Sequence, residues 1–292
     1  MEELTPARAS GEPVLAPIAR DDLPEVGRFL TENLNRRIPP EQWAASVTHE
    51  WCSARPNYGM KLTADGRLVG VFLAIYSDQV IRGQSERVCN PHTWCVLKEY
   101  RARAVGLAAA LVKQPGYHFS MLTPNPNVDA VFRFMKFREL DKRVCIFPNL
   151  PGVGRGTVTD VPAEMRRQLA GSDLADYDRH AAIPWLRHFV LTGADGRACW
   201  VVHKPRVWKR LPCADLLHVS DPAVFRAHLA TVRNYLLFRC RMAWGRIETR
   251  FVGAPLPLSL ARERTQPKLF LSPTLADGDV RDLYSELVSL DI

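Results

Sequence analysis

The chain has no long hydrophobic run. The longest one, Leu68–Tyr76 (LVGVFLAIY), has nine residues, whereas a helix that crosses a bilayer needs about 20 apolar residues. The N-terminus carries acidic Glu2 and Glu3 and has no apolar core segment, so the sequence gives no sign of a signal peptide. We therefore expect a cytoplasmic protein with no membrane partner.

The sequence also lacks the spacings of common metal sites. It contains no CxxC pair, no HExxH motif and no closely spaced group of Cys and His, so we expect no metal. Its seven cysteines are odd in number, dispersed and mostly set in apolar sequence, which is typical of reduced core residues. They are Cys52, Cys89, Cys95, Cys145, Cys199, Cys213 and Cys240.

Positive charge is in excess. The net charge is +8 in 292 residues, of which 47% are hydrophobic, so the chain can fill one large core or two smaller ones while its surface attracts anions. CoA, a nucleic acid or an anionic nucleotide-linked sugar would each suit that surface. Lys204, Arg206, Lys209 and Arg210 form a local basic group. We interpret it as a solvated loop, because no recognised nucleic-acid motif accompanies it.

The stretch from Thr93 to Phe137 carries the most information. It has the pattern of a strand, a basic turn rich in small residues, a helix, a second strand and a second helix. A helix start presents unpaired N–H groups and partial positive charge, and small residues such as Ala104 and Gly106 let a diphosphate approach the backbone. The pattern therefore predicts a pyrophosphate site at the start of this helix.

This segment resembles the acyl-CoA-binding motif of the GNAT (GCN5-related) N-acyltransferases, whose pattern is Gln or Arg, any two residues, Gly, any one residue, and then Gly or Ala. Tyr100-Arg101 match the family's usual Tyr-Arg lead-in, which gives Arg101-x-x-Ala104-x-Gly106. A second register, Arg103-x-x-Gly106-x-Ala108, fits the letters literally. We prefer the first register, because it keeps Val96 at the end of the strand.

The resemblance implies acetyl-CoA, or another acyl-CoA, as co-substrate. The pyrophosphate would lie on the N–H groups of residues 103–107, and a main-chain N–H near Val96 would polarise the thioester carbonyl. Phe132 stands where the family often has a Tyr that serves as the general acid, and Lys136 replaces the Gly of a Gly-Phe pair. The expected cofactor contacts are Val96, Arg101, Arg103, Ala104, Val105, Gly106, Leu107, Asn125 and Phe132.

A base must take a proton from the incoming amine. His92 lies just upstream on the motif strand, and the unperturbed pKa of a histidine is near neutrality. We choose it as the catalytic residue, with Glu86 and Glu99 as weaker alternatives. Trp43, Trp51 and Trp94 are interpreted as core residues, although they are also candidates for the wall of an acceptor cleft.

The segments before the motif have the order that the resemblance implies. We expect a strand over 14–18, a helix that begins at Asp21 or Asp22, a helix over 41–51, and a hairpin at Asp65-Gly66. The predicted fold class is α/β (α+β), a GNAT-like acyl-CoA N-acyltransferase fold with a twisted mixed sheet flanked by helices.

The second half contains a weak echo of the first. LTGADGR at 191–197 repeats LTADGR at 62–67, and each copy is followed by an apolar strand. The later copy has Ser220-Asp221-Pro222 where the phosphate turn would be, and an Asp there repels a pyrophosphate. We therefore predict a duplicated fold: a GNAT-like acyl-CoA-binding domain over 1–150 and a second domain over 151–292 that lacks the pyrophosphate loop.

The resemblance thus implies an acyl-CoA-dependent N-acyltransferase, with acetyl as the default acyl group. It would act by direct transfer in a ternary complex on the amine of a small molecule such as an amino sugar or an amino acid. Two alternatives stay open, a non-catalytic CoA- or RNA-binding protein and an aminoacyl-tRNA-dependent transferase. Nucleic acid is a less favoured partner than a small-molecule amine.

Overall fold

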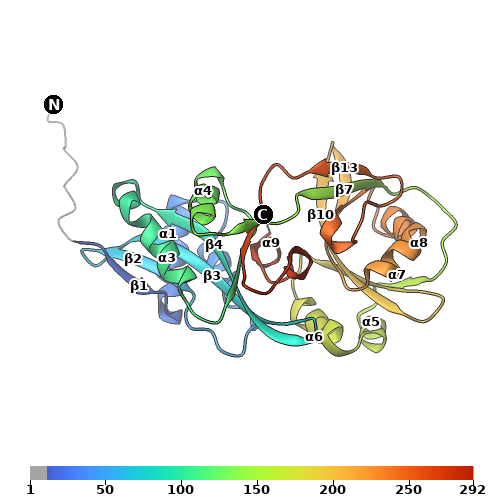
Figure 1. Cartoon of the computed structure of the whole chain (residues 1–292), viewed down its shortest axis with the longest axis horizontal. Helices are drawn as coiled ribbons and strands as arrows, with labels where there is room; N and C mark the ends of the chain where they lie inside the picture. Colours follow the sequence, from blue (N-terminus) through green and yellow to red (C-terminus); the bar gives the residue numbers. More distant parts are fainter. Residues whose placement is uncertain (1–11, 292) are drawn as a thin grey trace.

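A computed structural model describes residues 12–291 as two lobes, each built on a seven-stranded sheet (Figure 1). The first sheet has, in spatial order, β1 (Val14–Pro17), β2 (Gly59–Ala64), β3 (Arg67–Ile81), β4 (Gln84–Val96), β5 (His118–Met121), β14 (Leu269–Leu271) and β6 (Arg138–Glu139). The second has β13 (Leu260–Glu263), β7 (Arg143–Pro148), β12 (Trp244–Glu248), β11 (Leu211–Val219), β10 (Ala198–Trp208), β9 (Arg187–Thr192) and β8 (Thr157–Thr159).

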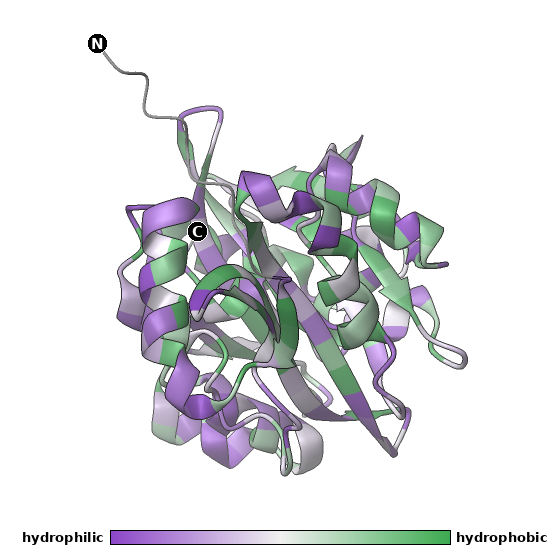
Figure 2. Cartoon of the chain, turned by 90° about the vertical axis from the view of Figure 1, so that its left-hand side faces the viewer, coloured by the Kyte–Doolittle hydropathy of each residue, from purple (hydrophilic) through white to green (hydrophobic). Residues whose placement is uncertain are grey.

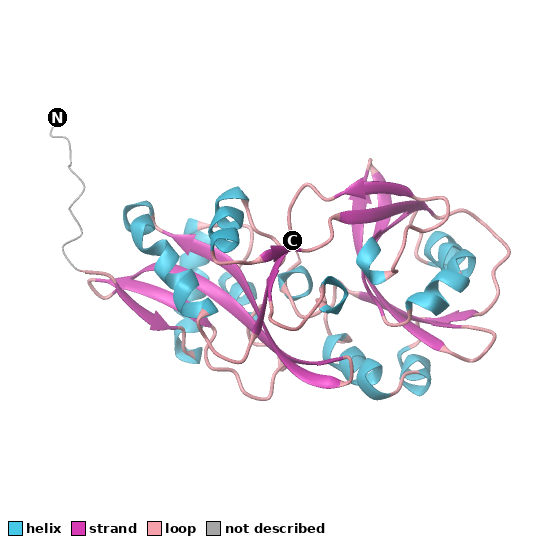
Figure 3. Cartoon of the chain, viewed as in Figure 1, coloured by secondary structure: helices cyan, strands magenta, loops and turns pink. Residues whose placement is uncertain are grey.

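Helices flank both sheets, so the chain is mixed α/β as expected (Figure 3). The first half has α1 (Leu23–Asn33), α2 (Pro40–Ala45), α3 (Ala104–Val112) and α4 (Pro126–Phe134). The second half has α5 (Pro162–Gln168), α6 (Gly171–His180), α7 (Pro222–Ala227), α8 (Leu229–Asn234) and α9 (Glu286–Ser289). A π-helical turn at Tyr235–Arg239 follows α8.

The two sheets share one pairing pattern. Every neighbouring pair is antiparallel except one in each sheet, β4 with β5 and β11 with β12. In both sheets a run of antiparallel strands leads to that parallel pair, and two short strands complete the sheet beyond it. This common order is consistent with duplication, as the repeated LTADGR and LTGADGR hairpins predict.

The two halves also exchange a strand. β7 follows β6 in the chain but lies in the second sheet, between β12 and β13. In return β14, near the C-terminus, lies in the first sheet between β5 and β6. The predicted boundary at residue 150 therefore falls after a strand of the second sheet, and the sheets interleave across it.

The apolar run of β3 is explained by burial on both faces. Val71 and Leu73 pack with α1 and α2 on one face, and Phe72 and Ala74 pack with α3 and α4 on the other. A strand covered on both sides has a continuous rather than an alternating apolar pattern. The cluster that holds Val71 continues into the second lobe and the C-terminal segment, so one core joins the two halves. Hydrophobic residues accordingly concentrate along the strands (Figure 2).

Most predicted elements of the first half are confirmed. The unit at 93–137 has the predicted order, with β4, α3, β5 and α4 in succession. The hairpin turn has φ of 50° at Asp65 and 72° at Gly66, as a tight turn with two left-handed residues requires. The second predicted helix is shorter than expected and ends at Ala45, because a turn and an irregular segment replace its second half.

Candidate functional site

The first sheet splits between its two central parallel strands. β4 pairs with β5 only at Val88 and Cys89, and then continues to Val96 without that neighbour. Asn90 lies where the strands separate and donates from its side-chain amide to the carbonyl of Ser120 at 2.8 Å. Beyond that point Thr93 has φ of 54° at a register shift between β3 and β4, which is the geometry of a β-bulge. Main-chain groups on this edge of β4 are therefore free of β5.

A cavity of about 410 Å³ lies at this split. We call it the split-sheet cavity. Its lining residues are Phe72 and members of four segments, 34–43, 92–94, 121–128 and 286–290. They come from the α1–α2 connection, the bulge of β4, the β5–α4 connection and the C-terminal helix α9. The volume suits a small molecule or the reactive end of a longer one.

Four side chains in this lining have a buried polar atom without a hydrogen-bond partner among residues 12–291. They are the indole N–H groups of Trp43 and Trp94, Nε2 of His92 and Oε2 of Glu286. Unpaired buried polar groups are rare in folded proteins, and each needs a reason such as a bound molecule or a catalytic role. Their gathering at one cavity points to a polar ligand there.

Glu286 is held in the cavity by contacts from both separated strands. Its Oε1 accepts from the hydroxyl of Thr123 at 2.7 Å, just after β5, and its backbone N–H donates to Oδ1 of Asn90 on β4 at 3.2 Å. Ser285 begins α9 by accepting from the N–H of Leu287. The carboxyl of Glu286 therefore has a fixed position at the split, although the residue lies 196 positions from Asn90 in the chain.

Burial changes the proton affinity of both candidate bases. Burial raises the pKa of Glu286 above its ordinary value of 4.5, and the hydrogen bond from Thr123 opposes that rise only in part. Burial lowers the pKa of His92 to about 3. The choice of His92 as the base assumes an unperturbed, near-neutral pKa. That assumption is wrong, because the residue is only 1% exposed. His92 lies in the cavity, but it is a weak base there.

The predicted pyrophosphate turn is partly closed. A 3₁₀ helix, Lys98–Arg103, runs directly into α3, and the N–H of Ala104 already donates to the carbonyl of Arg101. This N–H is one of those expected to bind pyrophosphate, so the turn offers fewer free donors than an open loop. Arg101 and Arg103 are exposed beside it, and none of the side chains of residues 12–291 caps the helix start. Arg101 supplies positive charge at the predicted place, whereas Arg103 forms an exposed ion pair with Glu12 at 3.1 Å.

The other predicted cofactor residues near this turn differ in their exposure to solvent. Val105 and Gly106 are exposed on the first turn of α3, and Val96 lies at the end of the unpaired edge of β4. Leu107 is buried in the core. A Cβ added at Gly106 would meet only Leu15 at 3.7 Å, an ordinary contact.

Asn125 and Phe132 have local structural explanations. The side chain of Asn125 accepts from the N–H groups of Asn127 and Val128 and so begins α4, while the residue also lines the split-sheet cavity. Phe132 is fully buried and packs edge-to-face on Phe137 with ring centroids 4.7 Å apart. It does not line the cavity.

In the second half, the backbone N–H groups at the corresponding helix start, that of α7, already have a hydrogen-bond partner. The carboxylate of Asp221 accepts from the N–H groups of Ala223 and Val224, both at 2.9 Å, and so caps α7. The negative charge expected to repel a pyrophosphate therefore lies on the donors themselves. The absence of a pyrophosphate site from the second half stays a prediction.

The basic group at 204–210 is not one solvated loop. Lys204 is 1% exposed and donates to the carbonyls of Leu287 and Leu290 at 3.3 and 2.6 Å. It fixes the segment that carries Glu286. Lys209 and Arg210 are exposed, as the loop interpretation requires. The prediction was wrong for Lys204, because a distant C-terminal segment covers it.

Within residues 12–291, no helix is long and apolar enough to cross a membrane. Nor do His, Cys, Asp and Glu side chains of that range gather in threes as they would around a metal ion.

Comparison with known proteins gives relatives by structure only. No protein-family model matches the chain, and no curated protein matches it in sequence. A GCN5-related N-acetyltransferase from Anabaena variabilis matches with a TM-score of 0.60 and 10% identity, over 89% of this chain and 72% of that one. A conserved protein from Enterococcus faecalis, described as a probable N-acyltransferase, gives 0.59 and 11% over the same shares.

A third similar structure is a GCN5-related N-acetyltransferase from Kribbella flavida. Its TM-score is 0.55 at 14% identity, over 90% of this chain and 72% of that one. In each case the match extends over most of both lobes rather than over one. The chain therefore has the fold of the GCN5-related N-acetyltransferases.

Proposed function

We propose that this protein is an acyl-CoA-dependent N-acyltransferase that transfers an acyl group, acetyl by default, directly to the amine of a small molecule. One observation carries the proposal: four residues that line the cavity at the split between β4 and β5 each have a buried polar atom without a hydrogen-bond partner among residues 12–291. The similarity of the fold to N-acetyltransferases supports this reaction class, and the split-sheet cavity would be the place where a thioester and an amine meet.

The acyl donor would enter along the unpaired edge of β4. Its pyrophosphate would lie near Arg101, Arg103 and Gly106, and its thioester carbonyl would accept from a main-chain N–H between Thr93 and Val96. Such a donor gains strength in a site shielded from water.

Glu286 would act as the base. The amine nitrogen attacks the thioester carbonyl carbon, the carbon–sulfur bond breaks, and the amine proton passes to the Glu286 carboxylate. Its raised pKa makes it a stronger base than an ordinary carboxylate. CoA leaves as a thiolate, which takes a proton from water. A thiol of pKa about 8.5 is a fair leaving group, so Phe132 in place of a tyrosine is tolerable.

Calorimetric titration of acetyl-CoA tests the proposal. Gly106→Glu puts a carboxylate where the pyrophosphate would bind, and Gly106→Gln adds nearly the same bulk without the charge. Both variants should fold, because the position is open and the glycine lies in a helix. We expect micromolar binding to the parent, weaker binding to Gly106→Gln and none to Gly106→Glu. Failure of acetyl-CoA and CoA to bind the folded parent would overturn the proposal.

A further inference from the structure

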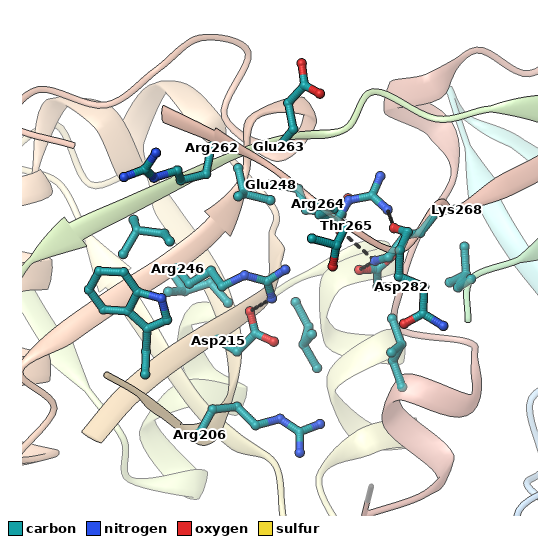
Figure 4. A pocket seen from close by; sticks show the side chains of 18 of the residues that line it. Arg206, Asp215, Arg246, Glu248, Arg262, Glu263, Arg264, Thr265, Lys268 and Asp282 are labelled. Carbon is teal, nitrogen blue, oxygen red and sulfur yellow. Dashed lines mark hydrogen bonds and ion pairs between the residues drawn. The ribbon is translucent and has the colours of Figure 1, made fainter. Parts of the chain in front are cut away.

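A second cavity, of about 550 Å³, shares the lining residue Thr123 with the first; Figure 4 shows the side chains that line it. We call it the charged cavity, because six basic and four acidic side chains line it. Thr123, which holds Glu286, lines both cavities, and Leu287 lines the charged cavity directly after Glu286 in the chain. The charged cavity is therefore a direct neighbour of the proposed reaction centre.

Two of its acidic side chains are fully neutralised. Glu248 pairs with Arg250 at 2.6 Å, with Lys268 at 2.7 Å and with Arg264 at 3.3 Å. Asp282 pairs with Arg250 and Lys268 as well. Two carboxylates thus share three cations in a buried network, so this wall of the cavity does not repel an anion.

A third carboxylate is also already paired. Asp215 accepts from Arg246 at 2.7 Å, and both side chains come from the central parallel strands of the second sheet, β11 and β12. In Figure 4 Asp215 lies between the guanidinium groups of Arg246 and Arg206. The remaining acidic residue, Glu263, is exposed on the edge strand β13.

Arg206 supplies a cation that has no partner. It lies on β10, half-buried in the lining of the charged cavity, and makes no hydrogen bond or ion pair with any side chain or carbonyl of residues 12–291. A guanidinium group is a planar fork that fits a carboxylate or a phosphate with two parallel hydrogen bonds. Six basic side chains against four acidic ones give the lining of the cavity an excess of two positive charges.

We propose that the charged cavity binds an anionic group of the acceptor, a carboxylate or a phosphate, on Arg206 while the acceptor's amine lies at Glu286. The acceptor is then an amine that also carries an acid group, not a simple polyamine. This inference rests on the proposed transferase function for its catalytic half, but the anion site itself can be tested by binding alone.

The binding test uses succinate and inorganic phosphate as probes, with tryptophan fluorescence as the readout, because Trp208 lines the charged cavity. Arg206→Gln removes the free guanidinium. Arg67→Gln, an exposed arginine at the start of β3, is the matched control. We expect one probe to bind the parent, Arg67→Gln and Gly106→Glu alike, and to bind Arg206→Gln roughly tenfold or more weakly. Equal binding to parent and Arg206→Gln, or no binding to the parent, would overturn the inference.

The catalytic test uses acceptor pairs that differ only in the acid group. L-lysine is compared with cadaverine for a carboxylate, and glucosamine 6-phosphate with glucosamine for a phosphate, with CoA release as the assay. We expect the acidic member of one pair to have a kcat/KM roughly tenfold or more above its partner in the parent but not in Arg206→Gln.

Separate outcomes distinguish the two ideas. A parent that binds acetyl-CoA and acetylates both members of each pair equally well contradicts the acceptor inference and leaves the transferase function standing. Arg206-dependent anion binding in a protein that does not bind acetyl-CoA would support the anion site and contradict the transferase function.

Discussion

Replacing Glu286 with glutamine should abolish most of the transferase activity without lowering stability. Glutamine keeps an oxygen that can accept from Thr123 and keeps the backbone N–H that donates to Asn90. Its amide nitrogen takes the place of Oε2, which has no partner among the described residues. The substitution therefore removes the charge and the basic oxygen while the packing stays nearly the same.

The sign of the stability change follows from the raised pKa. In the unfolded chain the carboxyl loses its proton near 4.5, whereas in the folded protein burial keeps it protonated to a higher pH. Between those two values the folded state binds more protons, so the free energy of unfolding falls as pH rises. That cost is about 1.4 kcal/mol for each pH unit between the two pKa values. Glu286→Gln removes the cost, and its unfolding free energy at pH 7 should equal or exceed that of the parent.

The activity should change far more. A positioned base contributes about 10²–10⁴-fold to the rate, so kcat/KM should fall by that factor in a CoA-release assay. In the parent, kcat/KM should rise with pH through the raised pKa of Glu286, and Glu286→Gln should flatten that rise. Thr123→Val is the matched control. It removes the hydrogen bond that favours the charged carboxylate, and should move the rise to higher pH while keeping the activity.

Two results would refute this reasoning. One is a Glu286→Gln enzyme that keeps kcat/KM within about tenfold of the parent, since a base is worth more than that. The other is a variant that loses activity and urea resistance together, which would make Glu286 a structural residue.

Two further predictions concern the core. Glu248→Gln should lower the urea unfolding free energy by about 3–5 kcal/mol, because the buried network of Arg250, Lys268 and Arg264 then has only one carboxylate, that of Asp282. Burial alone would raise the pKa of Glu248, but Lys268 and Arg250 hold it well below 4.5, so its contribution should be lost as pH falls below that value. An unchanged acid transition would contradict this. Phe132→Tyr should cost about 1–3 kcal/mol, since it buries a hydroxyl in an aromatic cluster. It should not raise turnover, and a faster enzyme would place residue 132 in the acid role.

Local patterns in the sequence predicted the parts of the fold that depend on local physics. The turn at Asp65-Gly66 follows from backbone preferences that act within a few residues. The order of elements over 93–137 follows from changes in hydrophobic period. The echo at 191–197 predicted a second sheet, because it repeats a hairpin of the first.

The parts that sequence reasoning missed depend on distant contacts. β14 has only three residues, and its partners on β5 and β6 lie more than a hundred positions earlier. Glu286 lies in a C-terminal segment for which the sequence indicates no partner, and its position is explained by the contacts with Asn90 and Thr123. The local signal for a helix here is Ser285, which stands two residues before the apolar pair Leu287-Val288 and is a favourable N-cap residue. The pKa of His92 depends on its burial, which the residues next to it in the sequence do not indicate.

The strand exchange explains why the second half belongs to the candidate site although its own helix start is capped by Asp221. Lys268 and Asp282 join the buried network beside the charged cavity, β14 completes the first sheet next to β5, and Glu286 enters the split-sheet cavity. All of these belong to the C-terminal segment that returns from the second half. Lys204 on β10 then fixes the end of that segment. The second half therefore contributes the proposed base and the proposed acceptor site, while the first half contributes the proposed cofactor site, so neither half alone contains the proposed reaction centre.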